Sequence, residues 1–549
     1  MEDIIGIECK NISYAPAEPA MKRPDIHFIK EVIHYKNGTT KPNLRLVTDF
    51  KKPVYVTIEN YRRHKDKKES EEIKRLIKIE TTQSNQWVDI SKKLNLYVPN
   101  GKINTKLLRD SPYVYGADVG SWVHIKHMYH SKFPDAISNS SVCCLDTETS
   151  TQDDTLLMLT IAMYGKSKTY IRKDFLKNNL NIENDLNYLY LKYIPDEDIK
   201  SSYSREFILV DNELEIVQQA FVQIHKWCPD FLAIWNMDFD MSVILNVLEK
   251  YMVAPEDIFN DPSIPENWRY FKYIRDDNVK ETASGVNKPP SPHERWHVVK
   301  NLASFYIIDA MCAYHYVRVG SKQVPGGYSL DNILSKELGS KLKKIKFEED
   351  PNVKDLLGIE WHRYMQKHRP LHYVIYNIWD VLSMLMLDKK TQDLEVSVPT
   401  LIGDSSFEIF KSNPKKLIDA IYWTYLENDR VLGTRPSAAV DKTGIVLSDW
   451  IVMLPATNIV DDGMETIEEF PNIKTNTRGF VFDSDQTAGY PSDSQAINIS
   501  KDTMMREIIY EEGDIGLMKR LENINLMFGK VNSVKFCTKI LKFPKLEDL

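Results

Sequence analysis

The pattern of apolar and polar positions divides the middle of the chain into short apolar runs and longer stretches with apolar residues at helical spacing. Short runs bounded by polar residues predict strands, and the longer periodic stretches predict helices. The predicted elements are, in order, three strands (142–146, 156–165 and 168–172), a helix (212–227), a strand (231–236), a second helix, a strand (304–311) and a last helix (372–390). Three strands followed by alternating helices and strands indicate an α/β fold.

The flanking segments differ from this central part. Before it, strand-like runs (44–50 and 52–60) are followed by a highly charged stretch, 61–78, for which we predict a helix. A segment rich in Ser, Pro and Asn, 131–141, indicates a domain boundary. Turn-rich sequence beyond about residue 395 indicates another domain. The expected fold class is therefore multidomain α/β and α+β, and the central strand order is that of a ribonuclease-H-like sheet.

The composition is that of a globular protein. A chain of 549 residues is long enough for about two to four domains, and 42% hydrophobic with 27% charged residues supplies ample core. No apolar run approaches the ~20 residues of a membrane span, and the acidic amino terminus lacks a secretion signal. The six cysteines have neither paired nor metal-binding spacing. We therefore expect a cytoplasmic protein with no membrane partner.

The net charge of −7 argues against a protein that is held on nucleic acid by charge alone. Nucleic acid stays open as a partner, because a cluster of acids lowers the total charge while basic patches lie elsewhere. Two basic stretches, 61–78 and 340–346, fit such patches. The simpler interpretation of both is a solvent-exposed helix face.

Two acids one residue apart, Asp146 and Glu148, end the first apolar strand. Strand residues at this spacing point to the same side, where two carboxylates repel each other and lose solvation unless a cation compensates. A divalent cation between them would relieve the repulsion, and Mg²⁺ prefers carboxylate oxygens. Taken alone, the pair is more typical of a surface turn.

Two further polar groups of residues follow the same pattern. Asn236, Phe239 and Asp240 come after the fourth predicted strand, and the alternative is an Asn/Asp turn that caps the next helix. Tyr376 and Asp380 lie four apart on the last helix and share one face, where the alternative is an ordinary polar stripe. The agreement of all three groups in order, spacing and element type predicts one metal-binding cleft.

Four acids in one cleft suit phosphodiester hydrolysis with two Mg²⁺ or Mn²⁺ ions roughly 3.5–4 Å apart. One ion would activate the attacking water, and the other would stabilise the leaving 3′ oxygen. Tyr376, a hydroxyl near neutral pH, would orient that water. Asn236 and Phe239 would flank the cleft, and an aromatic face stacks on a terminal base without sequence preference. These features predict a single-stranded 3′ end of DNA as the substrate.

This set of residues resembles the proofreading 3′–5′ exonuclease domain of B-family replicative DNA polymerases, most closely the polymerases of large tailed bacteriophages. Three longer segments are also similar to that family: 111–119, 210–240 and 326–341. The resemblance implies that Tyr376 positions the water and that four acids are the metal ligands. These acids are Asp146, Glu148, Asp240 and Asp380. For a phage-encoded protein, the expected location is the cytoplasm of the host cell.

A later segment, 482–500, resembles the first polymerase motif of the same family. By this resemblance, Asp485 is a metal-binding aspartate of the palm, and Tyr490 contacts the incoming nucleotide. Ala488 and Gly489 replace the usual Ser-Leu of the motif, which weakens the expected nucleotide contact, and the alternative is a Pro-bearing turn. A second palm aspartate and the lysine of a fingers helix do not follow in the sequence, so we expect no polymerisation by this chain alone.

The resemblance therefore predicts the exonuclease-bearing subunit of a split DNA polymerase. The expected regions are an amino-terminal domain (1–138), the ribonuclease-H-like exonuclease (139–395), a returning or linking region (396–475) and a partial palm (476–549). The expected partners are primer-template DNA, a second polypeptide with the rest of the palm, fingers and thumb, and a sliding clamp. A shortened polymerase copy, a free-standing DNA or RNA exonuclease and a non-catalytic DNA-binding scaffold stay open as alternatives.

Overall fold

The structure is a computed structural model, and it falls into two units, Met1–Val446 and Leu447–Leu549. The first unit contains the candidate site. The described residues are 3–65, 67–97, 102–176, 181–276, 279–281, 287–318 and 324–435, with four short strands in the second unit. These strands form two antiparallel pairs, β19 (Thr466–Ile467) with β20 (Phe470–Lys474) and β21 (Met527–Phe528) with β22 (Val531–Asn532).

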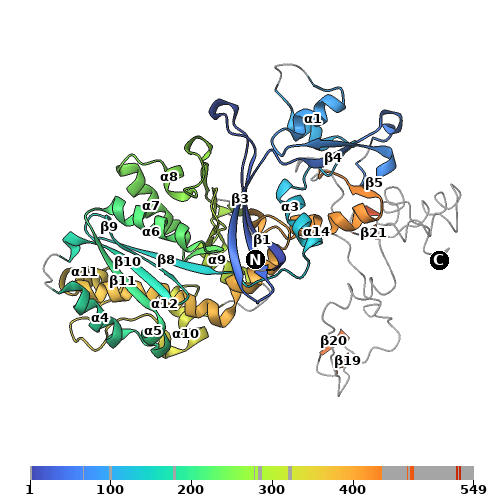
Figure 1. The fold of residues 1–549 in the computed structure, drawn as a ribbon. Coiled ribbons are helices and arrows are strands. Elements are labelled where there is room, and N and C mark those ends of the chain that lie inside the picture. Colours follow the sequence, from blue (N-terminus) through green and yellow to red (C-terminus); the bar gives the residue numbers. More distant parts are fainter. Residues whose placement is uncertain are drawn as a thin grey trace. The chain divides into compact units, whose positions relative to one another are not determined.

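A six-stranded mixed sheet forms the centre of the first unit (Figure 1). Its order is β11 (Ser204–Val210), β10 (Lys166–Arg172), β9 (Leu156–Met163), β8 (Val142–Thr149), β12 (Phe231–Ile234) and β17 (Tyr306–Asp309). The first three strands along the chain are antiparallel neighbours, whereas β12 and β17 run parallel to β8. All five predicted strands are present, and the coarse prediction of an α/β fold is confirmed. The edge strand β11, which runs parallel to β10, was not predicted.

Helices cover both faces of this sheet. α6 (Glu213–Trp227) and α7 (Met237–Lys250) pack on one face, and α4 (Ile182–Tyr193), α10 (Leu330–Leu338) and α12 (Pro370–Thr391) pack on the other (Figure 1). The side chains of β8 alternate between the two layers. Cys144 belongs to the core of the α12 face, while Cys143 and Leu145 belong to the core of the α6–α7 face. Continuing this alternation turns Asp146 and Glu148 toward α12.

The longest of the described helices, α12, packs on the face of the sheet that also carries α4 and α10. Pro370 occupies the first helical position, where its missing N–H costs nothing. Lys389 and Lys390 lie in the last turn, where cations interact favourably with the helix dipole. Every residue from Tyr373 to Leu385 is buried. The helix therefore holds its polar side chains inside the protein, next to the sheet.

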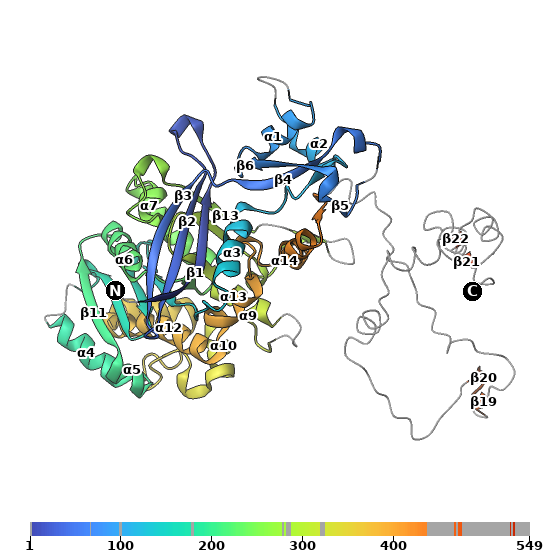
Figure 2. The same cartoon turned by 45° about the vertical axis from the view of Figure 1, so that its right-hand side comes forward.

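The amino-terminal residues form two smaller antiparallel sheets (Figure 2). One contains β1 (Ile4–Ala15), β2 (Ile26–Tyr35) and β3 (Thr40–Thr48), and the other contains β4 (Lys52–Thr57), β6 (Leu76–Thr81) and β7 (Val114–Tyr115). A late strand, β18 (Arg430–Leu432), pairs with β5 (Ser70–Glu72), so the chain after the sheet returns to this region.

The predicted helix at 61–78 is wrong, because β5 and β6 occupy the second half of that stretch. The reason lies in its spacing: Ile77 and Ile79 alternate with the exposed Lys78 and Glu80. A period of two is typical of a half-buried strand. The many charged residues of the stretch 61–78 led to the helix prediction, although its apolar residues alternate as in a strand.

Further elements complete the described part of the chain. The helices are α1 (Gln86–Lys93), α2 (Thr105–Asp110), α3 (Ser121–Lys132), α5 (Glu197–Ser202), α8 (Pro255–Phe259), α9 (Ala310–Val317), α11 (Gly358–His368), α13 (Val398–Ile402) and α14 (Asn413–Glu427). The strands are β13 (Phe271–Ile274), β14 (Lys280–Glu281), β15 (Asn287–Lys288) and β16 (Val298–Asn301). Among the described helices, none combines the length and the apolar character that a membrane crossing requires.

Candidate functional site

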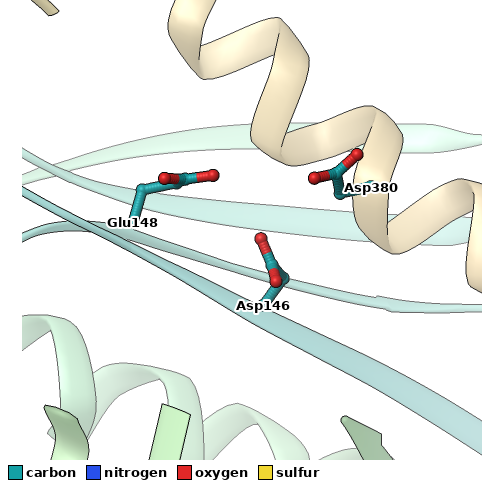
Figure 3. Close-up of side chains that lie close together, drawn as sticks. All are labelled: Asp146, Glu148 and Asp380. Atoms are coloured by element: carbon teal, nitrogen blue, oxygen red, sulfur yellow. The ribbon is translucent and has the colours of Figure 1, made fainter. Parts of the chain in front are cut away.

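Three of the predicted acids come together between β8 and α12. Asp146 and Glu148 project from the end of β8, and Asp380 projects from α12 (Figure 3). One carboxylate oxygen from each residue lies within 4.8 Å of the others. The two-residue spacing on the strand and the position of α12 over that face of the sheet account for this arrangement.

Burial and mutual repulsion shift the ionisation of these acids. Burial raises the pKa of Asp146 well above its usual value, and the charges of Asp240 and Glu148 raise it further. Burial likewise raises the pKa of Glu148 to about 8. The pKa of Asp380 is also raised by burial, although the Lys344 ammonium opposes the rise. Because the carboxylates of this site are buried and repel one another, the site favours a bound cation.

Lys344 supplies one such positive charge. Its Nζ donates to Oδ2 of Asp380 at 2.6 Å and to the hydroxyl of Tyr376 at 3.1 Å. Neighbouring contacts hold the lysine segment in place: the indole of Trp379 donates to the carbonyl of Lys343, and the backbone N–H of Lys344 donates to Asp331. The ammonium is therefore fixed between the helix and the acids.

The expectation of a solvent-exposed helix face at 340–346 is wrong for Lys344. The segment leaves helical geometry after Leu342, and the Lys344 side chain is 22% exposed against 40% for Lys343 and 45% for Lys346. Uniform lysine-rich sequence gives no signal that one member of the run turns inward. The prediction treated the run as one surface, although its members differ in exposure.

Tyr376 lies where the sequence predicts it, on the same face of α12 as Asp380. Its hydroxyl accepts the hydrogen bond from Lys344. Burial, followed by the charge of Asp380, raises the pKa of Tyr376 well above its usual value. The side chain is thus a neutral hydroxyl that keeps its proton for donation to an acceptor.

Asp240 stands beside the three acids and not among them. Its Oδ1 accepts hydrogen bonds from the backbone N–H of Thr147 at 2.9 Å and from the Thr147 hydroxyl at 2.6 Å. Thr147 alternates with Asp146 and Glu148 along β8, so its side chain points to the α7 face of the strand. Burial raises the pKa of Asp240 to about 7. Three of the four predicted acids therefore have carboxylate oxygens within 4.8 Å of one another, while Asp240 acts on Asp146 through its charge and its role as a metal ligand stays a prediction.

Asn236 and Phe239 begin α7 near Asp240. Asn236 adopts a left-handed conformation (φ 65°) at the helix start, and its side chain does not cap the helix. The alternative in which the Asn236 side chain caps the helix is therefore wrong. Non-glycine residues in the left-handed region cluster at functional sites. Phe239 is 52% exposed, so its ring is open to a stacking partner. Neither side chain joins the group of acids.

Comparison with known proteins gives no match from which the function of the site could be inferred. No protein-family model matches the chain, and no curated protein matches it either. The two residues of the predicted palm motif, Asp485 and Tyr490, lie outside the described residues.

A single stripe of α12 supplies further contacts to the acids. Tyr373, Tyr376, Asn377 and Asp380 are spaced as i, i+3, i+4 and i+7, which places them on one helix face. The Asn377 amide donates to Oδ2 of Asp146 at 2.7 Å. The Tyr373 hydroxyl donates to Oε2 of Glu148. Sequence reasoning missed both residues, although their spacing from Asp380 was a usable signal.

The donor set fits a hard divalent cation such as Mg²⁺. Its three carboxylates offer the oxygen ligands that Mg²⁺ prefers. Within the described part of the chain, Oδ1 of Asp380 is buried and has no hydrogen-bond partner. A buried carboxylate oxygen without a donor is costly, and a cation would satisfy it. Asp146, Glu148 and Asp380 are thus the residues that could hold a metal ion.

Proposed function

We propose that this chain is a metal-dependent 3′–5′ exonuclease that hydrolyses single-stranded DNA ends, as the proofreading part of a B-family DNA polymerase. The observation that carries the proposal is the meeting of Asp146, Glu148 and Asp380 beside the Tyr376 hydroxyl and the Lys344 ammonium. Carboxylates that can hold divalent ions suit metal-assisted phosphodiester hydrolysis, in which the ions stabilise the attacking and the leaving oxygen.

The strand order supports a ribonuclease-H-like fold within this proposal. Along the sheet the order β10-β9-β8-β12-β17 carries three antiparallel strands followed by two strands parallel to β8. The sequence prediction of that fold rests on the order of the same elements along the chain, three strands followed by alternating helices and strands. β11, an additional strand beside β10, extends the sheet at the edge away from the acids.

Each group in the site has a role in the proposed reaction. Bound Mg²⁺ ions would supply an activated water and stabilise the leaving 3′ oxygen. Asp146, Glu148 and Asp380 would hold the ions. Tyr376 accepts a hydrogen bond from Lys344 and so presents its own proton to the attacking water or to a phosphate oxygen. Lys344 offsets the negative charge of Asp380.

The groups around the three acids fit a single-stranded end. Phe239 offers an exposed ring for stacking on a base. Asp240 fixes the backbone of β8 between the two strand acids through Thr147. Its charge also acts on Asp146, so Asp240 remains the predicted fourth acid of the site.

The polymerase part of the proposal rests on the sequence motif at 482–500. We propose that Asp485 and Tyr490 belong to a palm that is completed by a second polypeptide on primer-template DNA. A free-standing exonuclease is the second candidate, favoured by one observation: all the hydrolytic groups named above lie in the unit Met1–Val446. Purification from the native source separates the two, since only the split polymerase predicts a stoichiometric partner.

The test of the proposed activity uses the full chain and a single-stranded oligonucleotide labelled at its 5′ end. With Mg²⁺, the wild type should produce a ladder that shortens from the 3′ end. The double variant Asp146→Asn/Glu148→Gln should lose about 1,000-fold or more of this rate, because it removes two ligands at once.

A matched control removes two acids of the same kinds from the surface. Asp211 and Glu206 have side chains that are 68% and 58% exposed, and Asp211→Asn/Glu206→Gln should retain full activity. A wild-type chain without metal-dependent hydrolysis, or an acid variant as active as the control, would refute the proposal.

A further inference from the structure

Three donors and acceptors converge on the hydroxyl of Tyr373, one turn before Tyr376 on α12. The hydroxyl donates to Oε2 of Glu148. Nδ1 of His362 lies 2.8 Å from the same hydroxyl oxygen, and Nε2 of Gln366 lies 3.3 Å from it. His362 and Gln366 are four apart on α11, so both reach Tyr373 from one helix face.

With Glu148 ionised, the form that can hold a metal ion, counting protons assigns the direction of every bond in this group. A phenol has a single proton to donate, and Tyr373 gives it to Glu148. Gln366 therefore donates its amide proton to the Tyr373 oxygen. His362 must also act as a donor there, so its ring carries a proton on Nδ1. Gln366 and His362 thus donate to the Tyr373 oxygen, and Tyr373 alone donates to the Glu148 carboxylate.

α11 also holds the end of β8, from which Glu148 projects. The Gln366 amide nitrogen donates to the carbonyl of Thr149 at 2.8 Å, and its oxygen accepts from the backbone N–H of Thr151 at 2.9 Å. A single side chain therefore bridges the strand end and Tyr373. This bridge couples the backbone next to Glu148 to the hydroxyl that Glu148 binds.

We propose that Tyr373 is a positioning residue for Glu148, with its hydroxyl held by His362 and Gln366. Because the hydroxyl occupies Oε2, the other carboxylate oxygen of Glu148 is left free to bind an ion that Asp146 and Asp380 would also hold. Partners of a ligand's second atom orient the ligand and raise its affinity for metal. The inference rests on the proposed metal site and extends it to residues on α11.

A purely structural role for Tyr373 can be separated from this one. Its ring is buried, 1% exposed, and packs near Phe175 and Trp361 at centroid distances of 6.4 Å and 6.1 Å. Tyr373→Phe keeps these ring contacts and removes only the hydroxyl. Tyr190→Phe is the matched control, because Tyr190 is buried in the same core and its hydroxyl has no hydrogen-bond partner among the described residues.

The experiment compares these two variants of the full chain in three measurements. They are kcat and KM on a single-stranded oligonucleotide, Mn²⁺ affinity by electron paramagnetic resonance, and the melting temperature. Tyr373→Phe should lower kcat and weaken Mn²⁺ binding, each by about 10- to 100-fold, with KM within about twofold of wild type. Tyr190→Phe should change neither.

The α11 residues give a second, graded test. His362→Asn keeps an N–H near the position of Nδ1, and His362→Leu removes it, so the first should retain more activity and more Mn²⁺ affinity than the second. Unchanged kcat and unchanged Mn²⁺ affinity in Tyr373→Phe would overturn the inference. A loss that merely tracks a lowered melting temperature would also overturn it.

Failure of the proposed function has a different signature. In that case the wild type would not hydrolyse DNA, while weaker Mn²⁺ binding in Tyr373→Phe than in wild type would still support the positioning role. A wild type that binds no Mn²⁺ at the three acids would overturn both.

Discussion

Lys344 donates a 2.6 Å hydrogen bond to Oδ2 of Asp380, in an ion pair whose carboxylate is 3% exposed. The lysine thereby neutralises the acid that lies farthest along the chain from the two acids of β8. Its second bond, to Tyr376, ties the same charge to the proposed water-positioning hydroxyl. The Lys344 ammonium thus links Asp380, a proposed metal ligand, to Tyr376, the residue that would orient the attacking water.

Removing this ammonium should destabilise the chain when no metal is present. Lys344→Met leaves Asp380 buried without its cation, and breaking a buried pair in this way should cost about 2 kcal/mol at this partial exposure. Mg²⁺ should restore part of the loss, because it supplies positive charge to the same acid. Urea unfolding with and without Mg²⁺ measures both effects. Equal stability of variant and wild type without metal would contradict the proposed role of the pair.

Removing a ligand should have the opposite effect on the metal-free chain. Asp146→Asn relieves repulsion from Asp240 and Glu148 and keeps an oxygen for the Asn377 amide. We expect a gain of about 1 kcal/mol without metal. The stabilisation that saturating Mg²⁺ gives the wild type, about 2.7 kcal/mol at 100 times Kd, should disappear. Thermal melting across a Mg²⁺ titration checks this, and an undiminished shift in the variant would place the ion elsewhere.

The exposed ring of Phe239 should contribute to DNA binding and not to chemistry. Phe239→Ala should raise KM for single-stranded DNA about fivefold or more, since stacking on one base is worth about 1–3 kcal/mol, with little change in kcat. Tyr188→Ala is the control, because Tyr188 is an aromatic residue that is 64% exposed on α4, on the other side of the sheet. If both variants bind DNA as well as wild type, Phe239 is not a stacking residue.

Acid should destabilise the protein through His124 on α3. This side chain is 4% exposed and lies edge-on to Tyr422 and Trp423, and burial lowers its pKa to about 3. The unfolded chain takes up a proton below about pH 6.5, whereas the folded chain does not do so until about pH 3, so stability falls as the pH drops through this window. At pH 5 the cost is about 2 kcal/mol.

The variant His124→Gln removes the titrating ring. Its loss of unfolding free energy between pH 7 and pH 5 should be smaller than that of wild type by about 2 kcal/mol. Urea denaturation at the two pH values measures the difference, independently of any constant effect of the substitution. The same acid-induced loss in both proteins would show that another group is responsible.

Local sequence predicted those parts of the site that depend on one element. The spacing of Asp146 and Glu148 on a strand and of Tyr376 and Asp380 on a helix fixes which side chains share a face. The apolar run before Asp146 predicted the buried strand that carries it. These relations need no knowledge of the remaining chain, and the structure agrees with them.

Local sequence patterns did not predict the contacts between residues on different helices and strands. Asp240 follows a predicted strand, as expected, but the side of the sheet on which α7 packs decides that its Oδ1 bonds to Thr147. Lys344 is turned inward by contacts from Trp379 and Asp331, which lie 35 and 13 residues away in the sequence. Tertiary contacts turn one lysine of the segment 340–346 inward. The composition of the segment does not show which lysine this is.

The most direct test of the central claim is anomalous diffraction from crystals of the full chain grown with Mn²⁺. The account predicts a Mn²⁺ peak at the three acids, with carboxylate oxygens of Asp146, Glu148 and Asp380 as direct ligands, since hard cations bind carboxylate oxygens. Clear density for the three side chains with no anomalous peak among them, at saturating Mn²⁺, would contradict it.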